Sequence, residues 1–177
     1  MRKRSLDELQ RISVPEFRSG AKFPLTLVLD NVRSLHNVGS VFRTGDAFRV
    51  EKIVLTGITG TPPHREIERS ALGATQSVVW EYVEDVSDAV RKLKEEGYPV
   101  LIVEQAEPSI ALQDFQWPDK GKLCLVFGNE VNGISESVLP LADGALEIPQ
   151  FGTKHSFNIS VCLGIVLWEV FRKSGAV

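Results

Sequence analysis

The sequence has few of the residues that mark disulfide, metal or membrane proteins. Its two cysteines, Cys124 and Cys162, both lie in apolar runs, so we interpret them as buried thiols in a reducing compartment. The three histidines stand at none of the spacings that metal sites use, so no metal is expected. No apolar run is long enough to span a bilayer, and the first ten residues do not resemble a signal peptide. We therefore expect a soluble, cytoplasmic protein without a membrane anchor.

The chain also lacks an overall excess of positive charge. Its net charge of −3 argues against nucleic-acid binding over the whole surface, because phosphate binding requires a cationic face. A local patch is still compatible with this charge. Residues 1–22 form a basic segment that we expect to be partly helical, and acidic residues concentrate between positions 81 and 107. This basic segment is either a nucleic-acid-binding element or a solvated charged face.

Apolar runs alternate with helical patterns along the chain, which predicts an α/β fold. The runs at 25–29, 100–103 and 123–127 are typical of parallel strands covered on both faces. We predict one domain over residues 1–177, with a parallel sheet and helices on both of its faces. The other predicted elements are a helix from near Leu6 to before Pro15, a helix capped by Asn37, strands at 52–56 and 78–83, a short helix at 66–72, and a helix capped by Ser87 that stops at Gly97.

The last predicted helix, at 157–172, is apolar on nearly every side. A terminal helix on a small domain is expected to keep one hydrated face. Cover by a second subunit would explain the apolar composition, and complete burial inside one chain is the alternative. The pattern favours a homodimer formed through this helix.

Three polar or glycine-containing loops follow apolar strands, and strand ends are where open α/β sheets bind ligands. The first loop leads into a helix that contains Asn37 and Arg43. The guanidinium group of Arg43 offers a fixed fork of donors for a phosphate. The alternative is a surface arginine and a helix cap with no function.

The second loop, at 127–135, has Gly128 and Gly133 at the spacing of a nucleotide phosphate-binding loop. Ile134 stands where such a loop requires lysine, which excludes that class. The chain has no GxGxxG pattern, which excludes an ordinary dinucleotide site. What is left is a backbone-rich turn with one carboxylate, Glu130, suited to a small polar ligand or an RNA group.

The third loop, at 146–160, ends at the start of the apolar helix. Ser156 and Asn158 can accept hydrogen bonds from the free N–H groups there, and this alone could explain both residues. Ser156 beside His155 also raises the possibility of a hydrolase nucleophile. We reject it, because adjacent side chains seldom meet and no GxSxG turn is present.

In this order and at these separations, the three segments resemble the signature motifs of the SpoU/TrmH family of SPOUT methyltransferases. The matching stretches are 31–48, 125–135 and 146–169, and 69–74 resembles the family's small-residue segment. The resemblance implies methyl transfer from S-adenosylmethionine to ribose 2′-hydroxyls of tRNA or rRNA. It also implies a deep trefoil knot, a topology that ordinary chain connections would exclude, and residues 120–172 form the expected knot and cofactor-binding region, to which Glu104 adds one contact.

The resemblance further implies the site residues. Those expected to contact S-adenosylmethionine are Glu104, Gly128, Ile148, Ser156 and Phe157. Those expected to act in catalysis are Arg43, Asn37, Glu130, Ser156 and Asn158. Because arginine keeps its proton in proteins, our hypothesis is that Arg43 holds the neighbouring RNA phosphate and the reacting oxygen, while the phosphate or a water accepts the proton.

The sequence is also compatible with three other functions. The chain could methylate rRNA, although its compact length favours tRNA; it could methylate a guanine base, as related SPOUT enzymes do; or it could bind RNA without catalysis. The second and third motifs favour the ribose, and intact Arg43, Glu130 and Asn158 favour catalysis. Gln150 and Phe157 depart from the family pattern, which leaves the fine details of the cofactor fit open.

Overall fold

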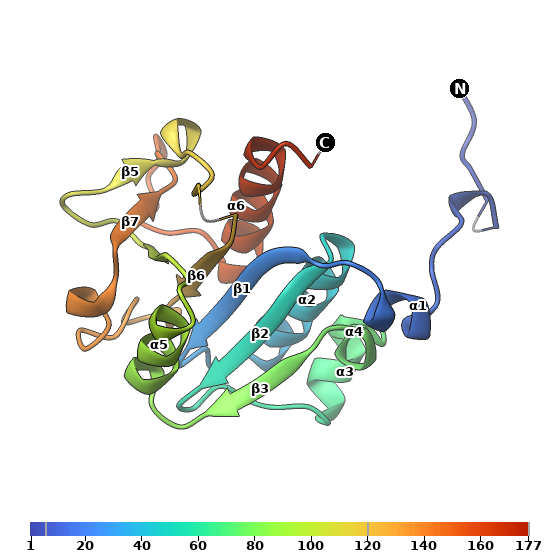
Figure 1. The fold of residues 1–177 in the computed structure, drawn as a ribbon, viewed down its shortest axis with the longest axis horizontal. Coiled ribbons are helices and arrows are strands. Elements are labelled where there is room, and N and C mark those ends of the chain that lie inside the picture. Colours follow the sequence, from blue (N-terminus) through green and yellow to red (C-terminus); the bar gives the residue numbers. More distant parts are fainter. Residues whose placement is uncertain (6, 120, 177) are drawn as a thin grey trace.

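The computed structural model describes residues 1–5, 7–119 and 121–176. They form a seven-stranded sheet of order β3-β2-β1-β6-β4-β7-β5 in which every pair of neighbours is parallel (Figure 1). This confirms the predicted parallel α/β sheet. The strands are β1 (Phe23–Asp30), β2 (Val50–Thr56), β3 (Trp80–Val83), β4 (Val100–Val103), β5 (Ile110–Ala111), β6 (Leu123–Phe127) and β7 (Gly144–Glu147).

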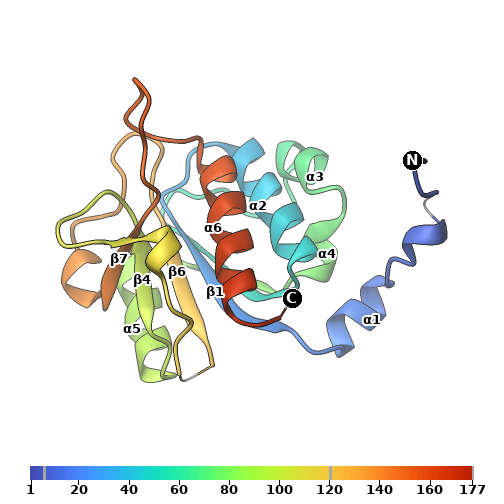
Figure 2. The same ribbon diagram turned by 90° about the horizontal axis from the view of Figure 1, so that it is seen from above.

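Helices cover both faces of the sheet, as predicted (Figure 2). Helices α2, α3, α4 and α6 lie on one face, and α5 lies on the other. No helix in the described ranges is long and apolar enough to cross a membrane. The helices are α1 (Val14–Ser19), α2 (Leu35–Ala47), α3 (Arg65–Ala71), α4 (Ala74–Ser77), α5 (Val86–Glu95) and α6 (Ile159–Lys173), with 3-10 turns η1 (Asp7–Leu9), η2 (Leu112–Asp114) and η3 (Leu139–Leu141).

The central strands are buried on both sides, which explains their continuous apolar sequence. On β6, Leu125 and Phe127 pack into the core beneath α2 and α6, whereas Cys124 and Val126 pack into the core beneath α5. Strand β1 divides its side chains in the same way, with Leu27 in the first core and Val28 in the second. Side chains alternate between faces along a strand, so a strand covered by helices on both sides is mostly apolar; in β1 the buried polar exceptions are Thr26 and Asp30.

The N-terminal helix differs from the prediction. Ser5 and Glu8 form the expected capping box, with the Ser5 N–H donating to the Glu8 carboxylate at 2.7 Å, but the box encloses only the turn η1. Leu6 lies outside the described residues. The predicted helix end before Pro15 is wrong: α1 starts at Val14, and Pro15 lies in its first turn, where the missing proline N–H costs nothing.

Two predicted helix caps are also wrong, although the helices themselves are confirmed. The side chain of Ser34, not Asn37, caps α2, and it accepts a hydrogen bond from the Asn37 N–H at 3.2 Å. Asp85, not Ser87, caps α5 and accepts from the Ser87 N–H at 2.7 Å. A cap must have extended backbone just before the first turn, and each predicted residue lies inside that turn instead.

Element boundaries shift by a few residues elsewhere. Strand β3 begins at Trp80, because Val78 still ends α4 by donating its N–H to the Ala74 carbonyl. Helix α6 begins at Ile159, two residues later than predicted, and of the two candidate caps it is Asn158, not Ser156, that caps it. The short strands β5 and β7 were not predicted. They extend the sheet beyond β4 and bring the end of β7 beside the end of β4.

Candidate functional site

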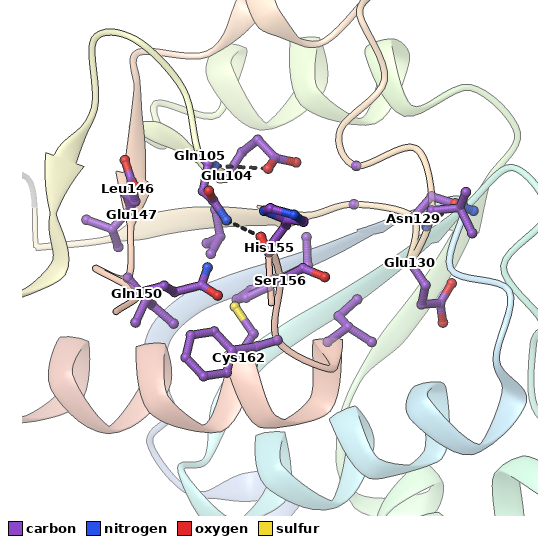
Figure 3. Close-up of a pocket in the computed structure, with 18 residues that line it drawn as sticks. Glu104, Gln105, Asn129, Glu130, Leu146, Glu147, Gln150, His155, Ser156 and Cys162 are labelled. Carbon is purple, nitrogen blue, oxygen red and sulfur yellow. Dashed lines mark hydrogen bonds between the residues drawn. The ribbon is translucent and has the colours of Figure 1, made fainter. Parts of the chain in front are cut away.

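A cavity of about 320 Å³ lies at the edge of the sheet where β4, β6 and β7 end (Figure 3). Segments around Glu104, Gly128, Ile148 and Ser156 line it, and the first turn of α6 closes one side. Small-molecule sites usually occupy about 300–1,000 Å³, so the cavity lies in the range for a cofactor. Its position agrees with the general placement of ligands at the carboxyl ends of parallel strands.

The structure brings the predicted cofactor residues together. Glu104, Gly128, Ile148, Ser156 and Phe157 all line this cavity, although they come from three separate loops. The lining is mixed: apolar side chains such as Val103, Leu146 and Ile148 alternate with carboxylate, amide and hydroxyl groups. Such a lining suits a ligand that has both a flat apolar part and polar ends.

The loop after β6 is shaped by its backbone. A Cβ on Gly128 would lie 2.3 Å from the carbonyl carbon of Gly133, so only glycine permits this approach. Asn129 and Gly133 exchange two backbone hydrogen bonds of 2.9 and 3.0 Å. The side chain of Asn129 accepts from the N–H groups of Val131 and Asn132 and donates to the Asn31 carbonyl at 2.7 Å. The Gly-Asn-Glu motif thus builds a tight turn whose backbone lines the cavity.

Glu104 extends from the end of β4 toward this loop. Its carboxylate accepts hydrogen bonds from the Gln105 N–H at 2.9 Å and from the Ile134 N–H at 3.3 Å. A carboxylate has about four acceptor positions, so two of them are free for a ligand. Gly133 has a φ of +69° and faces Glu104 so closely that a side chain there would displace the carboxylate.

A second polar cluster stands beside the cavity and contains three of the predicted catalytic residues. The Glu130 carboxylate accepts from the Asn37 side-chain amide at 2.9 Å and from the backbone N–H groups of Arg33 and Ser34 at 2.9 and 3.1 Å. The Asn158 side-chain amide donates to the Asn37 side-chain oxygen at 3.3 Å. These bonds connect the loop after β6, the start of α2 and the start of α6.

The electrostatics of this cluster fix Glu130 in its charged form. Desolvation alone would raise the pKa of the Glu130 carboxyl, but the hydrogen bonds from Arg33 N–H, Asn37 and Ser34 N–H outweigh it and lower the pKa below its ordinary value. Near neutral pH the carboxylate is therefore an acceptor only.

One buried carboxylate in this region was not among the sequence candidates. Asp30, the last residue of β1, is fully buried and accepts from the Ser135 N–H at 2.6 Å, from the Ser135 hydroxyl at 2.9 Å and from the Asn31 amide at 2.8 Å. These bonds fasten the loop after β6 to the end of β1. The sequence could have indicated Asp30, because it is a charged residue at the end of an apolar strand. Ligands bind at the carboxyl ends of parallel strands, so such a residue is a candidate for the site.

The structure does not bring Arg43 into the cavity. Arg43 lies on the exposed face of α2, six residues beyond Asn37, which corresponds to about 9 Å along the helix axis. Its guanidinium group makes no hydrogen bond or ion pair with any residue that the structure describes. It is therefore available to a ligand that reaches along α2 from the cavity.

The loop before α6 is mostly exposed and covers one side of the cavity. The Gln105 side chain donates to the His155 carbonyl, which joins this loop to the end of β4 (Figure 3). Phe151 is 97% exposed at the tip of the loop. His155 and Ser156 are both exposed, and the described residues contain no cluster of His, Cys, Asp or Glu that could hold a metal ion.

Both cysteines are free thiols, but only Cys124 is buried as predicted, whereas Cys162 is partly exposed. Cys124 is fully buried in β6, and burial raises the pKa of its thiol. Cys162 lines the cavity, where burial, together with the negative charge of Glu104, raises the pKa of its thiol to about 11. Both thiols are protonated at neutral pH and act as small hydrophobic groups.

Comparisons with known proteins agree with this geometry. Residues 24–168 match the model of the SpoU rRNA Methylase family. The tRNA (guanosine(18)-2'-O)-methyltransferase of Thermus thermophilus is 33% identical over 173 residues, which cover 97% of this chain and 82% of that protein.

Solved structures also resemble the chain. The A. aeolicus TrmH/SpoU tRNA modifying enzyme superposes with a TM-score of 0.80 at 26% identity, over 92% of this chain and 81% of that one. The AdoMet-bound rRNA methyltransferase from Sinorhizobium meliloti superposes with a TM-score of 0.79 at 27% identity, over 88% of this chain and 59% of that one. With its family model covering most of the sequence, the chain belongs to the SpoU rRNA methylase family.

Proposed function

We propose that this chain is an RNA methyltransferase that uses S-adenosylmethionine to methylate a ribose 2′-hydroxyl. The observation that supports this most strongly is the position of the cavity. All five predicted cofactor residues line it, and the hydrogen-bonded cluster of Glu130, Asn37 and Asn158 stands directly beside it. A cofactor site next to an independent polar cluster is the arrangement that group transfer between two substrates requires.

The residues of the cavity fit S-adenosylmethionine. The close approach at Gly128 exposes loop backbone to the ligand, so an adenosyl group could be bound by main-chain groups without a GxGxxG turn. Glu104 would hold hydroxyl or ammonium groups with its free acceptor positions, while Ile148 and Phe157 would contact the flat base. When bound, the cofactor supplies an electrophilic methyl group on a cationic sulfur.

The neighbouring residues would prepare the acceptor. Because the Glu130 carboxylate is held by three donors, it fixes the Asn37 and Asn158 amides in place. Those amides can orient the ribose and stabilise the charge that develops on its oxygen. We assign to Arg43 the RNA phosphate next to the reacting nucleotide, because its guanidinium group is exposed and cannot serve as a base at neutral pH. The proton of the hydroxyl then passes to the phosphate or to water.

We further propose tRNA as the substrate. The T. thermophilus tRNA enzyme is matched over 82% of its length, whereas the S. meliloti rRNA enzyme is matched over only 59%. The resemblance of the chain to both leaves the RNA class to be decided by experiment.

Two further features follow from the family. We infer that residues 120–172 contain the trefoil knot, which is supported by the insertion of β6 between the earlier strands β1 and β4. We also infer a homodimer through α6. Val161, Ile165 and Trp168 are 52, 38 and 54% exposed and form one apolar stripe at helical spacing on the outer face of this helix. Complete burial of α6 within one chain is therefore not the explanation of its apolar sequence.

Transfer of a tritiated methyl group from S-adenosylmethionine tests the proposed function. The purified chain should label unmodified tRNA transcripts in preference to rRNA fragments, and Arg43→Ala should reduce the label by at least about a hundredfold without weakening cofactor binding. Labelling of rRNA alone would overturn the tRNA assignment. A lack of label on every RNA would support a binding protein without catalysis.

Trp168→Glu should shift the chain toward monomers in sedimentation if α6 is the dimer interface.

A further inference from the structure

Four exposed arginines lie on two packed helices, α2 and α3, and on the loop just before α2, and we call this surface the α2–α3 face. They are Arg33, Arg43, Arg65 and Arg69. None of their guanidinium groups makes a hydrogen bond or an ion pair within the described part of the chain. Arg65 and Arg69 are one helical turn apart, so they point in the same direction from α3.

Close packing holds the two helices in a fixed relation. A Cβ on Gly39 of α2 would lie 2.1 Å from the Ser70 hydroxyl and 2.3 Å from the Ile67 carbonyl of α3, so the helices touch at a glycine. Figure 2 shows α3 beside α2, on the face of the sheet opposite α5. The arginines of α3 are thus fixed relative to the first turn of α2.

That first turn adjoins the cavity. The backbone N–H groups of Arg33 and Ser34 both donate to Glu130, which lines the cavity. The α2–α3 face therefore begins at the cavity mouth and continues outward along α3.

Acidic residues on the two helices neutralise little of this charge. The Glu68 carboxylate accepts from the Thr75 hydroxyl, and Asp46 accepts from the Ser77 hydroxyl, so both turn toward α4. Glu66 is the one exposed carboxylate within α2 and α3, both of which the structure describes in full. The face keeps a net positive charge although the whole chain carries −3.

The basic segment at the N-terminus is a weaker candidate for the same role. Arg2 pairs with Glu8 at 2.7 Å, Arg18 donates to the Gln76 carbonyl at 2.8 Å, and Lys22 donates to carbonyls at the end of α1. Half of the six basic residues before position 23 are therefore engaged within the chain. The segment also extends away from β6 and β7, whose ends form the cavity (Figure 1).

We propose that the α2–α3 face binds the RNA backbone beside the target nucleotide, with Arg65 and Arg69 holding phosphates that lie farther from the reacting ribose than the phosphate at Arg43. This inference rests on the proposed function, and it adds an RNA-docking surface outside the cavity. Guanidinium groups bind phosphate oxygens with paired donors, and the attraction weakens as salt increases.

The test compares RNA binding by two double variants over a range of potassium chloride concentrations. In Arg65→Gln/Arg69→Gln, affinity for an unmodified tRNA transcript should fall about tenfold near 0.1 M salt, and the slope of log affinity against log salt should decrease by about 0.7 per arginine. Arg65→Lys/Arg69→Lys should retain most of the affinity. Cofactor affinity and turnover at saturating RNA should stay at wild-type values in both variants.

The matched control is Arg91→Gln/Lys92→Gln on α5, which removes the same charge from the opposite face of the sheet. It should leave RNA affinity unchanged. If Arg65→Gln/Arg69→Gln kept the RNA affinity and the salt slope of the wild type, the inference would be overturned. An equal loss of RNA affinity in the control variant would also overturn it. Failure of the proposed function would be separate, because it would show as absence of methyl transfer by the wild-type chain while RNA binding is still measurable.

Discussion

The cavity and the α2–α3 face adjoin each other but are built in different ways. The cavity is shaped by backbone turns at Gly128 and Gly133, and its polar side chains are held by neighbouring N–H groups. The α2–α3 face consists of arginine side chains that have no partner among the described residues. A small ligand that is enclosed needs fixed geometry, whereas a polyanion that lies on the surface needs charge. The two regions should therefore respond to different perturbations.

The largest loss of cofactor affinity is expected from adding one methyl group at Gly128, in the loop after β6. Gly128→Ala places a Cβ 2.3 Å from the carbonyl carbon of Gly133, so the turn must open. The free energy of unfolding should fall by about 1–3 kcal/mol, and cofactor affinity should fall by at least about a hundredfold in calorimetric titration. Gly152→Ala is the control, because its Cβ meets nothing within 4 Å and it should bind the cofactor normally. Normal binding by Gly128→Ala would show that the loop backbone does not form the site.

Salt concentration should affect RNA binding at the α2–α3 face far more than cofactor binding in the cavity. If the four arginines each neutralise one phosphate, raising the salt from about 50 to about 200 mM should weaken RNA binding about fiftyfold, at a slope of about 0.7 per contact. Cofactor affinity should change less than about threefold over the same range, because binding in the cavity depends on hydrogen bonds and apolar contacts and not on the neutralisation of several phosphates. Parallel titrations of the two ligands measure both. If both affinities changed equally with salt, the claim that charge dominates binding only at the α2–α3 face would be wrong.

Glu130 connects the two regions, and its removal should have an intermediate effect. Glu130→Gln keeps one acceptor oxygen for three N–H donors, so the start of α2 should loosen and methyl transfer should fall about tenfold, with about 1 kcal/mol lost in unfolding free energy. An activity equal to that of the wild type would show that the cluster does not support the acceptor site.

The same carboxylate predicts a pH dependence of stability. The pKa of Glu130 is lower in the folded protein than in the unfolded chain, so the charged carboxylate stabilises the folded state. This stabilisation is complete above the unfolded pKa of about 4.3 and is lost as the pH falls through the lower folded pKa. Urea unfolding at pH 7 and pH 3 should therefore show a larger acid loss for the wild type than for Glu130→Gln. Equal losses would mean that the hydrogen bonds to Glu130 do not favour its charged form.

The smallest effect is expected at Cys162. Its thiol lines the cavity, but with a pKa of about 11 it is protonated and unreactive near neutral pH. Cys162→Ala should change cofactor affinity less than about threefold, and iodoacetamide should label the wild-type cavity slowly at pH 7.5. Rapid labelling that the cofactor prevents would indicate a reactive thiol and contradict this assignment.

Much of the fold was predictable because the signals are local. Continuous apolar runs such as 123–127 predicted strands buried on both faces, and the apolar run after Asn158 predicted the last helix to within two residues of its start. The strands β5 and β7 could not be predicted, since two to four residues that include Gly144 have no periodicity and depend on pairing with β4.

The candidate site was predicted only in part. The family motifs identified the residues of the cavity, but not the reason that Gly128 is required, because the clash with Gly133 arises in the folded turn. The role of Asp30 in fastening the loop after β6 depends on a contact with Ser135, more than one hundred residues away. The α2–α3 face was missed because Arg65 and Arg69 join Arg33 and Arg43 only when α3 packs at Gly39. Long-range packing of this kind leaves no local pattern in the sequence.

The most direct test of the central claim is the chemical position of the transferred methyl group. The wild-type chain is incubated with S-adenosylmethionine and unmodified tRNA transcripts, the RNA is digested to nucleosides, and the products are identified by mass spectrometry, with Gly128→Ala as the inactive control. We predict a single 2′-O-methylated nucleoside that is absent from the control. A methylated base, or no methylated nucleoside from the wild type on either tRNA or rRNA, would contradict the assignment of this cavity to ribose methylation.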